Sequence, residues 1–287
     1  MKLIRFGEAG NEKPGVHING VNYDASAFTG DYDEKFFAGG GLAHLNKTIE
    51  MQKGKLNVIP NEIRIGSPVA RPSKIVCIGL NYSKHAAETN AAAPAEPVIF
   101  LKSTSSLSGP FDPIIIPKNS GKTDWEVELA VVIEKKASYV EEDDAMNYVA
   151  GYVLHNDVSE REFQLERGGT WDKGKGCDSF APLGPWLATK DEIKNAHNLR
   201  LWLKLNGKIM QDGNTDDLIF NIPFLISYTS RFMTLLPGDI ISTGTPAGVG
   251  LGFSPNIYLK DGDVVELGID GLGTSRQKVV DYKNNLS

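Results

Sequence analysis

Cysteine and basic charge are both scarce in this chain of 287 residues. Its two cysteines, Cys77 and Cys177, form no C-x-x-C pair, which argues against a secreted disulfide scaffold and fits a reducing compartment. Lysine and arginine number 30 against 36 aspartates and glutamates, so the formal net charge is −6. Non-specific nucleic-acid binding needs a basic face, and we therefore expect no nucleic-acid partner.

Long apolar runs are also missing. No stretch approaches the roughly 18 apolar residues of a membrane span, and the first residues contain no apolar signal-peptide core. We therefore expect a cytoplasmic protein with no membrane partner. Hydrophobic residues make up 41% of the chain and charged residues 23%, which allows a packed core, while 30 glycines and 15 prolines predict many turns.

The hydrophobic pattern divides the chain near residue 70. Residues 1–69 predict a small N-terminal α+β domain that contains a hairpin around Asn19-Gly20. Residues 70–287 show short apolar runs between glycine and proline turns, which is typical of strands. We expect helices over residues 33–53 (interrupted at residues 39–41), around Ala87, and over residues 141–149, 159–166 and 222–234. The sequence thus predicts a strand-dominated α+β fold with a small N-terminal appendage.

Two glutamates stand two residues apart in the most informative segment, residues 123–133. Read as a strand, this segment places Glu126 and Glu128 on one face together with Ala130 and Val132, while the other face is apolar throughout. Such a strand is buried on both sides, so the two carboxylates would repel each other at a high desolvation cost. A divalent cation would offset that cost; the alternative is an exposed strand end with solvated glutamates.

A third carboxylate, Asp157, ends the next apolar strand and opens into a polar helix. Three carboxylates form an all-oxygen site, which favours Mg²⁺, Mn²⁺ or Ca²⁺ over zinc. His155 has the same parity as Asp157 in this strand, so it either supports the site or is an ordinary core histidine.

Glycine-rich and basic segments offer further candidates. Residues 242–252 follow a strand and either form a tight turn or hold a carboxylate with backbone N–H groups and the Thr245 hydroxyl. His85 and Glu88 share one helix face, which suits a general base and its orienting carboxylate as well as an ordinary surface pair. Lys175 lies among glycines and could approach an anion. Nothing depresses the pKa of Cys177, and no G-x-S-x-G nucleophile elbow is present.

Several segments, taken together and in order, resemble the fumarylacetoacetate hydrolase family. They are residues 79–88 (GLNYSKHAAE), 100–103 (FLKS), 124–129 (DWEVEL), 151–157 (GYVLHND), 174–186 (GKGCDSFAPLGPW) and 243–250 (TGTPAGVG). Each motif is weak alone, but their joint order over residues 70–280 is specific. Residues 158–169 resemble a narrower bacterial subgroup, which includes enzymes named 2,4-diketo-3-deoxy-L-fuconate hydrolase and relatives labelled ureidoglycolate lyase.

The resemblance implies a fold and a set of roles. The family fold is a mixed β-sandwich roll, usually a homodimer, so the division of the chain becomes a small domain over residues 1–69 and a catalytic domain over residues 70–287. The roles that the resemblance implies are metal ligands for Mg²⁺ or Mn²⁺ (Glu126, Glu128 and Asp157), a water-activating dyad on a mobile lid (His85 and Glu88), an oxyanion-binding lysine (Lys175), and substrate contacts (Arg161, Gln164 and Thr245). Gly176 departs from the pattern, because many members have serine there.

The implied reaction is the metal-dependent hydrolysis of a C–C bond in a small 2,4-diketo acid, an acylpyruvate or a 2,4-diketo-3-deoxy sugar acid, to give pyruvate and a second acid. Two enzymatic alternatives use the same site, namely decarboxylation or isomerisation of a 2-oxo acid and cleavage of ureidoglycolate. A third hypothesis is a catalytically silent, metal-stabilised binding protein; the presence of every catalytic residue type argues against it.

Overall fold

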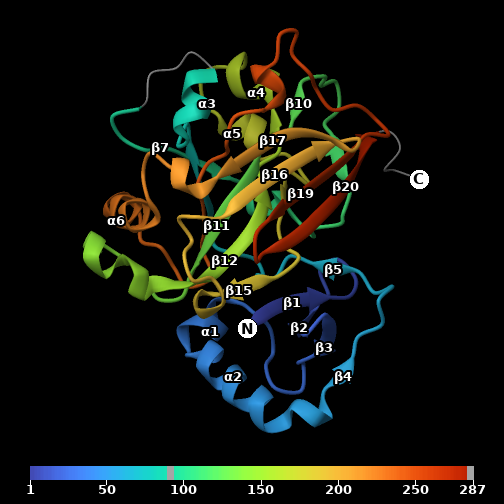
Figure 1. The fold of residues 1–287 in the computed structure, drawn as a ribbon, viewed down its shortest axis with the longest axis vertical. Helices are drawn as coiled ribbons and strands as arrows, with labels where there is room; N and C mark the ends of the chain where they lie inside the picture. The colour runs from blue at the N-terminus through green and yellow to red at the C-terminus, as the bar shows by residue number, and fades with distance from the viewer. Residues whose placement is uncertain (89–93, 283–287) are drawn as a thin grey trace.

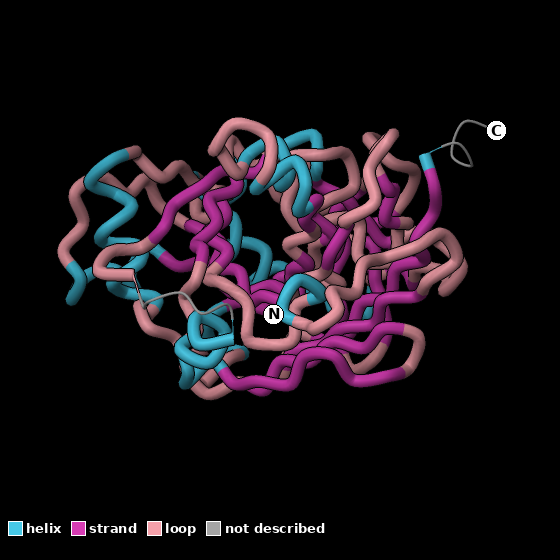
Figure 2. The backbone as a smooth tube through the Cα atoms, turned by 90° about the horizontal axis from the view of Figure 1, so that it is seen from above, coloured by secondary structure: helices cyan, strands magenta, loops and turns pink. Residues whose placement is uncertain are grey.

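Strands dominate the computed structural model, which describes residues 1–88 and 94–282 (Figures 1 and 2). The largest sheet has 11 strands, and its order in space is β4 (Asn57–Val58), β3 (Val21–Asp24), β2 (Lys13–Ile18), β1 (Lys2–Phe6), β15 (Leu187–Thr189), β12 (Val149–Asn156), β11 (Val127–Ile133), β18 (Ile240–Ser242), β6 (Ile75–Gly79) and β7 (Val98–Lys102), with β5 (Ile65–Gly66) paired to β1. Neighbours in this sheet are antiparallel except β18 and β6, so the sheet is mixed.

A second sheet of five strands packs beside the first. Its order is β17 (Lys208–Asn214), β16 (Arg200–Leu205), β19 (Val264–Ile269), β20 (Gly273–Asp281) and β9 (Ile114–Ile116). Two short pairs complete the strands, β10 (Thr123–Asp124) with β13 (Ser159–Glu160) and β14 (Ala181–Pro182) with β8 (Leu107–Ser108). The α-helices are α1 (Glu34–Ala38), α2 (Gly41–Gln52), α3 (Ser83–Glu88), α4 (Arg161–Leu165), α5 (Asp172–Lys175) and α6 (Ile222–Phe232). The strand-dominated α+β prediction is confirmed.

Strand β11 lies at the centre of the structure and is buried on both faces, as its sequence predicts. Every residue of β11 is buried. Val127 and Leu129 belong to the core between the two sheets, whereas Ala130 and Val132 belong to a second core on the opposite face of the large sheet. A strand between two cores holds its side chains in fixed positions, which is what a rigid site requires.

The N-terminal residues extend the large sheet. Within β1, Leu3 pairs with Val16 of β2 on one side and with Leu187 of β15 on the other, so the sheet is continuous from the N-terminal strands to the central ones. Asn19 and Gly20 form the turn between β2 and β3, as predicted. The domain boundary between residues 69 and 70 stays a prediction.

The predicted helices exist, with shorter bounds. Gly39 and Gly40 separate α1 from α2, so the expected interruption is present, although Gly41 is already the first residue of α2. The expected helix over residues 159–166 is wrong at its start, because Ser159 and Glu160 pair with β10 and only Arg161–Leu165 is helical. Residues 142–148 form a 3₁₀ segment in place of an α-helix.

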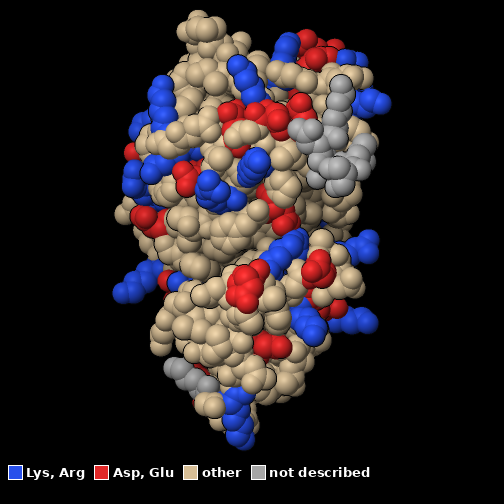
Figure 3. Space-filling model, turned by 90° about the vertical axis from the view of Figure 1, so that its right-hand side faces the viewer, with Lys and Arg blue, Asp and Glu red and all other residues tan. Residues whose placement is uncertain are grey.

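The charge distribution on the surface concerns the expectation of no nucleic-acid partner, and the length of the helices concerns the expectation of no membrane partner. Acidic and basic side chains are interspersed over the face in Figure 3, which shows no extended field of one sign. Within the described residues, no helix has the length and apolar character that crossing a bilayer requires.

The continuous sheet predicts that the N-terminal strands unfold together with the rest of the chain. Leu3 is fully buried, so Leu3→Ala should lower the free energy of unfolding by about 2–5 kcal/mol. All four tryptophans lie outside residues 1–69, but Trp186 stacks on His17 at a ring-centroid distance of 4.6 Å, so we replace Trp186 by phenylalanine in every protein compared, and the other three tryptophans then report on the remainder of the chain. We expect the urea midpoint of tryptophan fluorescence to fall in Leu3→Ala and to stay unchanged in the control Met51→Ala, whose side chain is 65% exposed. An unchanged midpoint in Leu3→Ala would show independent unfolding.

Candidate active site

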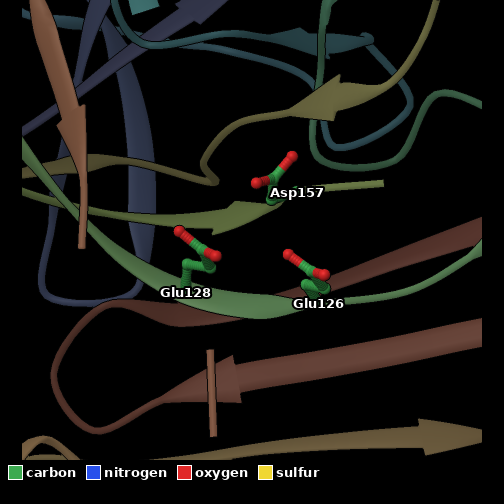
Figure 4. Close-up of side chains that lie close together, drawn as sticks. All are labelled: Glu126, Glu128 and Asp157. Carbon is green, nitrogen blue, oxygen red and sulfur yellow. The ribbon is translucent and has the colours of Figure 1, made fainter. Parts of the chain in front are cut away.

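Glu126, Glu128 and Asp157 meet at the edge of the two central strands. Each offers a carboxylate oxygen, and these oxygens lie within 4.8 Å of one another (Figure 4). The register of the sheet causes this meeting: Glu128 pairs with His155, and the Asp157 backbone N–H donates to the Glu126 carbonyl at 2.9 Å. All three side chains are buried, so the alternative of solvated glutamates at an exposed strand end is wrong.

Two lysines offset part of this buried negative charge. Lys175 donates to Glu126 at 2.8 Å and to Asp157 at 2.9 Å, and Lys102 donates to the other Asp157 oxygen at 2.5 Å. Burial raises the pKa of Asp157, but Lys102 and Lys175 outweigh it and hold that pKa well below its usual value. Burial likewise lowers the pKa of Lys175, yet its two carboxylate partners raise it overall, so this lysine stays cationic at neutral pH.

Arg161 is the third buried cation of the site. Its guanidinium lies 2.7 Å from a Glu126 oxygen and donates through Nε to Asp124 at 2.8 Å. The same guanidinium donates to the Gln164 side-chain oxygen at 3.0 Å. Since Lys175 and Arg161 together outweigh the effect of burial, the pKa of Glu126 lies below its usual value.

Glu128 is the carboxylate without a cationic partner within salt-bridge distance. Its Oε2 accepts hydrogen bonds from the Ser242 hydroxyl at 2.5 Å and the Gly244 N–H at 3.0 Å, which are neutral donors. Burial, and then the charges of Asp157 and Glu126, raise the pKa of Glu128 well above its usual value. The four carboxylates of the cluster, Asp124 included, face three cations, so ionisation of Glu128 would leave one negative charge without a cationic partner in the described part of the chain.

His155 supports Glu128 through Ser242. Because the Ser242 hydroxyl donates to Glu128, it accepts from Nδ1 of His155, which lies 2.7 Å away. Burial lowers the pKa of His155 to about 3, so the ring is neutral and keeps that N–H. The sequence left two interpretations of His155, a residue that supports the site or an ordinary core histidine, and its contact with Ser242 agrees with the supporting role.

The donor set fits a divalent cation. It consists of three converging carboxylates with no cysteine and no histidine directed at the same point, which is the chemistry that Mg²⁺ and Mn²⁺ prefer. A divalent cation would also offset the charge of ionised Glu128, which no cation of the described residues pairs with. Such a cation would convert a net negative cluster into a net positive one, suited to an anionic ligand.

The His85–Glu88 pair lies on α3, beside the carboxylates. The two side chains face each other with 3.3 Å between Nδ1 of His85 and Oε2 of Glu88. His85 is buried, while Glu88 is about one-fifth exposed. The predicted lid spans residues 82–93; the structure describes its first part as α3, and residues 89–93 lie outside the described residues.

The glycine-rich loop over residues 243–252 is the scaffold of the site. Its backbone N–H groups donate to three protein carboxylates, and the pairs are Gly244 with Glu128, Gly248 with Glu88, and Gly250 and Leu251 with Asp124. Gly248 has a φ of 104°, and a Cβ there would lie 2.0 Å from the Met210 carbonyl, so no other residue fits without rearrangement. The loop therefore holds three carboxylates of the protein itself through its backbone, and the expectation that it holds the carboxylate of a ligand stays a prediction.

The Thr245 hydroxyl is occupied by protein groups. It donates to the Val127 carbonyl at 2.8 Å and accepts from Gln211 at 2.8 Å. Thr245 thus fixes the start of β11 in this structure, and its contact with substrate stays a prediction.

One pocket of about 200 Å³ joins these groups. The predicted site residues that line it are His85, Glu126, Glu128, Arg161, Gln164, Lys175 and Thr245. Glu88 and Asp157 stand immediately behind the lining, each bonded to a lining residue. Cys177 does not line this pocket, and burial raises its pKa to about 11, which is unfavourable for a nucleophile.

Two functional residues escaped the sequence analysis. Asp124 and Lys102 both lie within the quoted motifs, but neither stood out, because their partners are 37 and 55 residues away. Asp124 accepts from Trp125, Gly250, Leu251 and Arg161 and so ties the glycine-rich loop to the arginine.

Comparison with known proteins places the chain among enzymes. A model described as fumarylacetoacetate (FAA) hydrolase C-terminal matches residues 74–280. A Burkholderia cenocepacia protein, provisionally named a hydrolase, is 51% identical over 279 residues, which cover 96% of this chain and 98% of that protein.

Solved structures show the same fold. Maleylpyruvate hydrolase from Sphingobium sp. SYK-6, in complex with manganese(II) and pyruvate, has a TM-score of 0.82 and 33% identity and covers 98% of this chain and 99% of its own. The 5-carboxymethyl-2-hydroxymuconate delta-isomerase from Mycobacterium smegmatis has a TM-score of 0.77 and 33% identity, with the same coverage. The narrower subgroup suggested by residues 158–169 stays a prediction.

The unpaired charge of Glu128 predicts a stabilising response to metal. Metal-free protein should gain about 2.7 kcal/mol of unfolding free energy when Mg²⁺ or Mn²⁺ is added at 100 times its dissociation constant. Glu128→Gln keeps the shape but removes the ionisable group, so this gain should be lost, whereas the metal-free variant should be at least as stable as the metal-free parent. Thermal unfolding with and without EDTA checks both expectations, with the exposed Glu141→Gln as control. An undiminished metal response in Glu128→Gln would reject the site.

Proposed function

The chain belongs to the fumarylacetoacetate hydrolase family, and from that premise we propose that it hydrolyses the C3–C4 bond of an acylpyruvate, a 2,4-diketo acid, to pyruvate and a second carboxylic acid. We propose Mg²⁺ or Mn²⁺, held by Glu126, Glu128 and Asp157, as its cofactor. The observation that supports this most is the shared pocket, in which a buried carboxylate triad faces a histidine–glutamate pair and two buried cations.

The cation would supply Lewis acidity, which polarises a substrate carbonyl and lowers the energy of negative charge that develops on its oxygen. Lys102 and Lys175 hold Asp157 deprotonated and so ready to bind such an ion. The neutral donors Ser242 and Gly244 orient Glu128 without competing for its charge. The protein thus fixes three oxygen ligands before any ion binds.

His85 would act as the general base. An imidazole whose Nδ1 faces a carboxylate is oriented and made more basic at its other nitrogen, which suits proton removal from water. Glu88 is itself held by the Gly248 N–H, at 3.0 Å and 3.1 Å from its two oxygens. The glycine-rich loop therefore positions the dyad and Glu128 on one backbone segment.

In the proposed steps His85 is the partner for the proton and Lys175 is the partner for the negative charge. Water gives one proton to His85, and its oxygen bonds to the C4 carbonyl carbon. The C3–C4 bond then breaks, and its electron pair moves to the pyruvate fragment as an enolate. Lys175, which is buried and cationic, stabilises the enolate oxygen, and the proton that His85 took from water passes to C3 to complete pyruvate, while the other fragment leaves as the carboxylic acid.

Arg161 and Gln164 are suited to hold the substrate carboxylate. Both lie on the short helix α4 and line the pocket. The Gln164 amide nitrogen donates to no group in the described part of the chain, while its oxygen accepts from Arg161. The contact with Arg161 fixes the orientation of the Gln164 amide, so its N–H₂ group is available to donate to a substrate carboxylate.

The isomerase neighbour keeps a second function in view. Decarboxylation or isomerisation of a 2-oxo acid would use the same enolate stabilisation but no attacking water. Cleavage of ureidoglycolate breaks a C–N bond to release urea and would also need no attacking water. The buried His85 beside Glu88 favours hydrolysis, because neither alternative needs a water-activating dyad.

A substrate panel tests the proposal. We expect pyruvate release from acetylpyruvate to require Mg²⁺ or Mn²⁺ and to exceed decarboxylation of oxaloacetate. Glu88→Gln and His85→Asn should each lower kcat by about 10²–10⁴-fold, the usual contribution of general-base catalysis, while the affinity for pyruvate changes little.

Lys84→Gln is the matched control for that panel, because Lys84 is an exposed residue on the same helix. Wild-type hydrolysis in Glu88→Gln would remove the dyad from the mechanism. Decarboxylation without hydrolysis would favour the second function, and inactivity on every 2-oxo acid with bound metal would favour a silent binding protein.

Asp124 is predicted to position Arg161 for the substrate carboxylate. Asp124→Asn replaces one accepting oxygen by a donor, so it should weaken the hold on Arg161 and on the Gly250 and Leu251 amides. We expect KM for acetylpyruvate to rise at least tenfold, about the value of one charge-assisted hydrogen bond, with a smaller change in kcat. Steady-state kinetics at saturating Mn²⁺ measure this, with the exposed Asp143→Asn as control; equal KM values would contradict the role.

A further inference from the structure

We propose that the acyl group accepted by this site is uncharged and apolar, so that the preferred substrates are alkanoyl- or aroylpyruvates, as opposed to acylpyruvates with a second carboxylate or a polyhydroxylated tail. The inference rests on the proposed function and adds the chemical class of the substrate tail. It follows from the polar and apolar side chains that line the pocket.

The two buried cations that line the pocket are both paired with protein carboxylates. Arg161 contacts Asp124 and Glu126, and Lys175 contacts Glu126 and Asp157. These two are the only lysine or arginine side chains that line the pocket among the described residues. Both cations are therefore needed for the 2-oxo acid end of a substrate, and neither is left for a second carboxylate.

Part of the pocket lining is aromatic. The rings of Phe100 and Trp171 pack at a centroid distance of 5.3 Å and both line the pocket. Trp171 rests directly on the backbone of Gly79, where an added Cβ would lie 2.4 Å from its ring. Glycine at this position thus lets the indole form the wall of the pocket. Phe100 also receives Lys175 over its ring face at 4.9 Å, so the charged and apolar parts of the lining meet here.

Aliphatic side chains continue this wall. Leu80, Leu165 and Leu251 also line the pocket. Leu80 has a φ of 54°, a conformation that costs an L-residue energy, and the adjacent Asn81 stabilises it with a buried hydrogen bond to the Thr243 carbonyl at 2.8 Å. Leu165 is 50% exposed, so a large apolar side chain faces solvent at the pocket. An apolar group that binds against Leu80 and Leu165 would explain both the backbone strain at Leu80 and the exposure of Leu165.

The basic side chains near Leu165 and Trp171 are also engaged. Lys173 donates to the Arg167 carbonyl at 2.7 Å, and Arg167 forms an ion pair with Glu162. Residues 89–93, which lie outside the described residues, contain no lysine, arginine or histidine in their sequence. A tail carboxylate would therefore lose water without gaining a cation, and a buried unpaired carboxylate is strongly unfavourable.

A matched set of substrates tests the inference in the wild-type enzyme with Mn²⁺. Butanoylpyruvate and succinylpyruvate have the same chain length and differ by a methyl group against a carboxylate; 7-hydroxy-2,4-dioxoheptanoate adds only a hydroxyl. We expect kcat/KM for butanoylpyruvate to exceed that for succinylpyruvate by about 100-fold or more, and that for the hydroxylated analogue by about tenfold.

A charge placed at the pocket should narrow that difference. Leu165→Lys adds a cation at a half-exposed position, so the fold is expected to tolerate it, and the preference over succinylpyruvate should fall at least tenfold. Val58→Lys, at a position 61% exposed on β4, is the control and should leave the preference unchanged.

The outcomes separate the two proposals. If wild-type enzyme cleaves succinylpyruvate or the hydroxylated analogue as efficiently as butanoylpyruvate, the apolar tail is rejected while acylpyruvate hydrolysis stands. An unchanged preference in Leu165→Lys would likewise contradict the assignment of this wall. If no acylpyruvate is cleaved, the proposed function itself fails.

Discussion

One buried charge imbalance organises this structure. Four carboxylates and three cations share one buried region, and ionisation of Glu128 would leave one negative charge uncompensated, which raises the pKa of Glu128. Isolated buried charges are costly, so each group in the cluster is fixed by at least one partner of opposite charge or by neutral donors. The two packed cores on either side of β11 hold those partners in place. A divalent cation completes the balance and makes the pocket attractive to an anion.

The glycine-rich loop positions the groups that have separate roles in the site. Within ten residues, its amides hold a candidate metal ligand, the carboxylate of the candidate base pair, and the aspartate that supports Arg161. A change in this loop would therefore disturb metal binding, water activation and substrate recognition together. Phe100 and Trp171 line the same pocket, and Phe100 also lies against Lys175, so the apolar part of the lining contacts the charged cluster directly.

Much of this site could be predicted from sequence, because alternation along a strand is a local property. The parity of Glu126 and Glu128 in an otherwise apolar segment predicted a buried pair, and the strand end at Asp157 supplied the third carboxylate. Asp124 and Lys102 could not be predicted in the same way, since their roles depend on partners brought close only by the fold. The late start of α4 has a similar cause: Ser159 and Glu160 pair with β10, and this long-range pairing overrides the local helical pattern.

The central claim is that the three carboxylates hold one divalent cation that the reaction requires. Stepwise addition of Mn²⁺ to verified metal-free protein, with pyruvate release from an acylpyruvate measured at each step, tests it most directly. The account predicts negligible turnover at the start and a linear rise that ends at one Mn²⁺ per chain, with no rise in Glu128→Gln. Full turnover in the metal-free protein, or an equal rise in the variant, would contradict it.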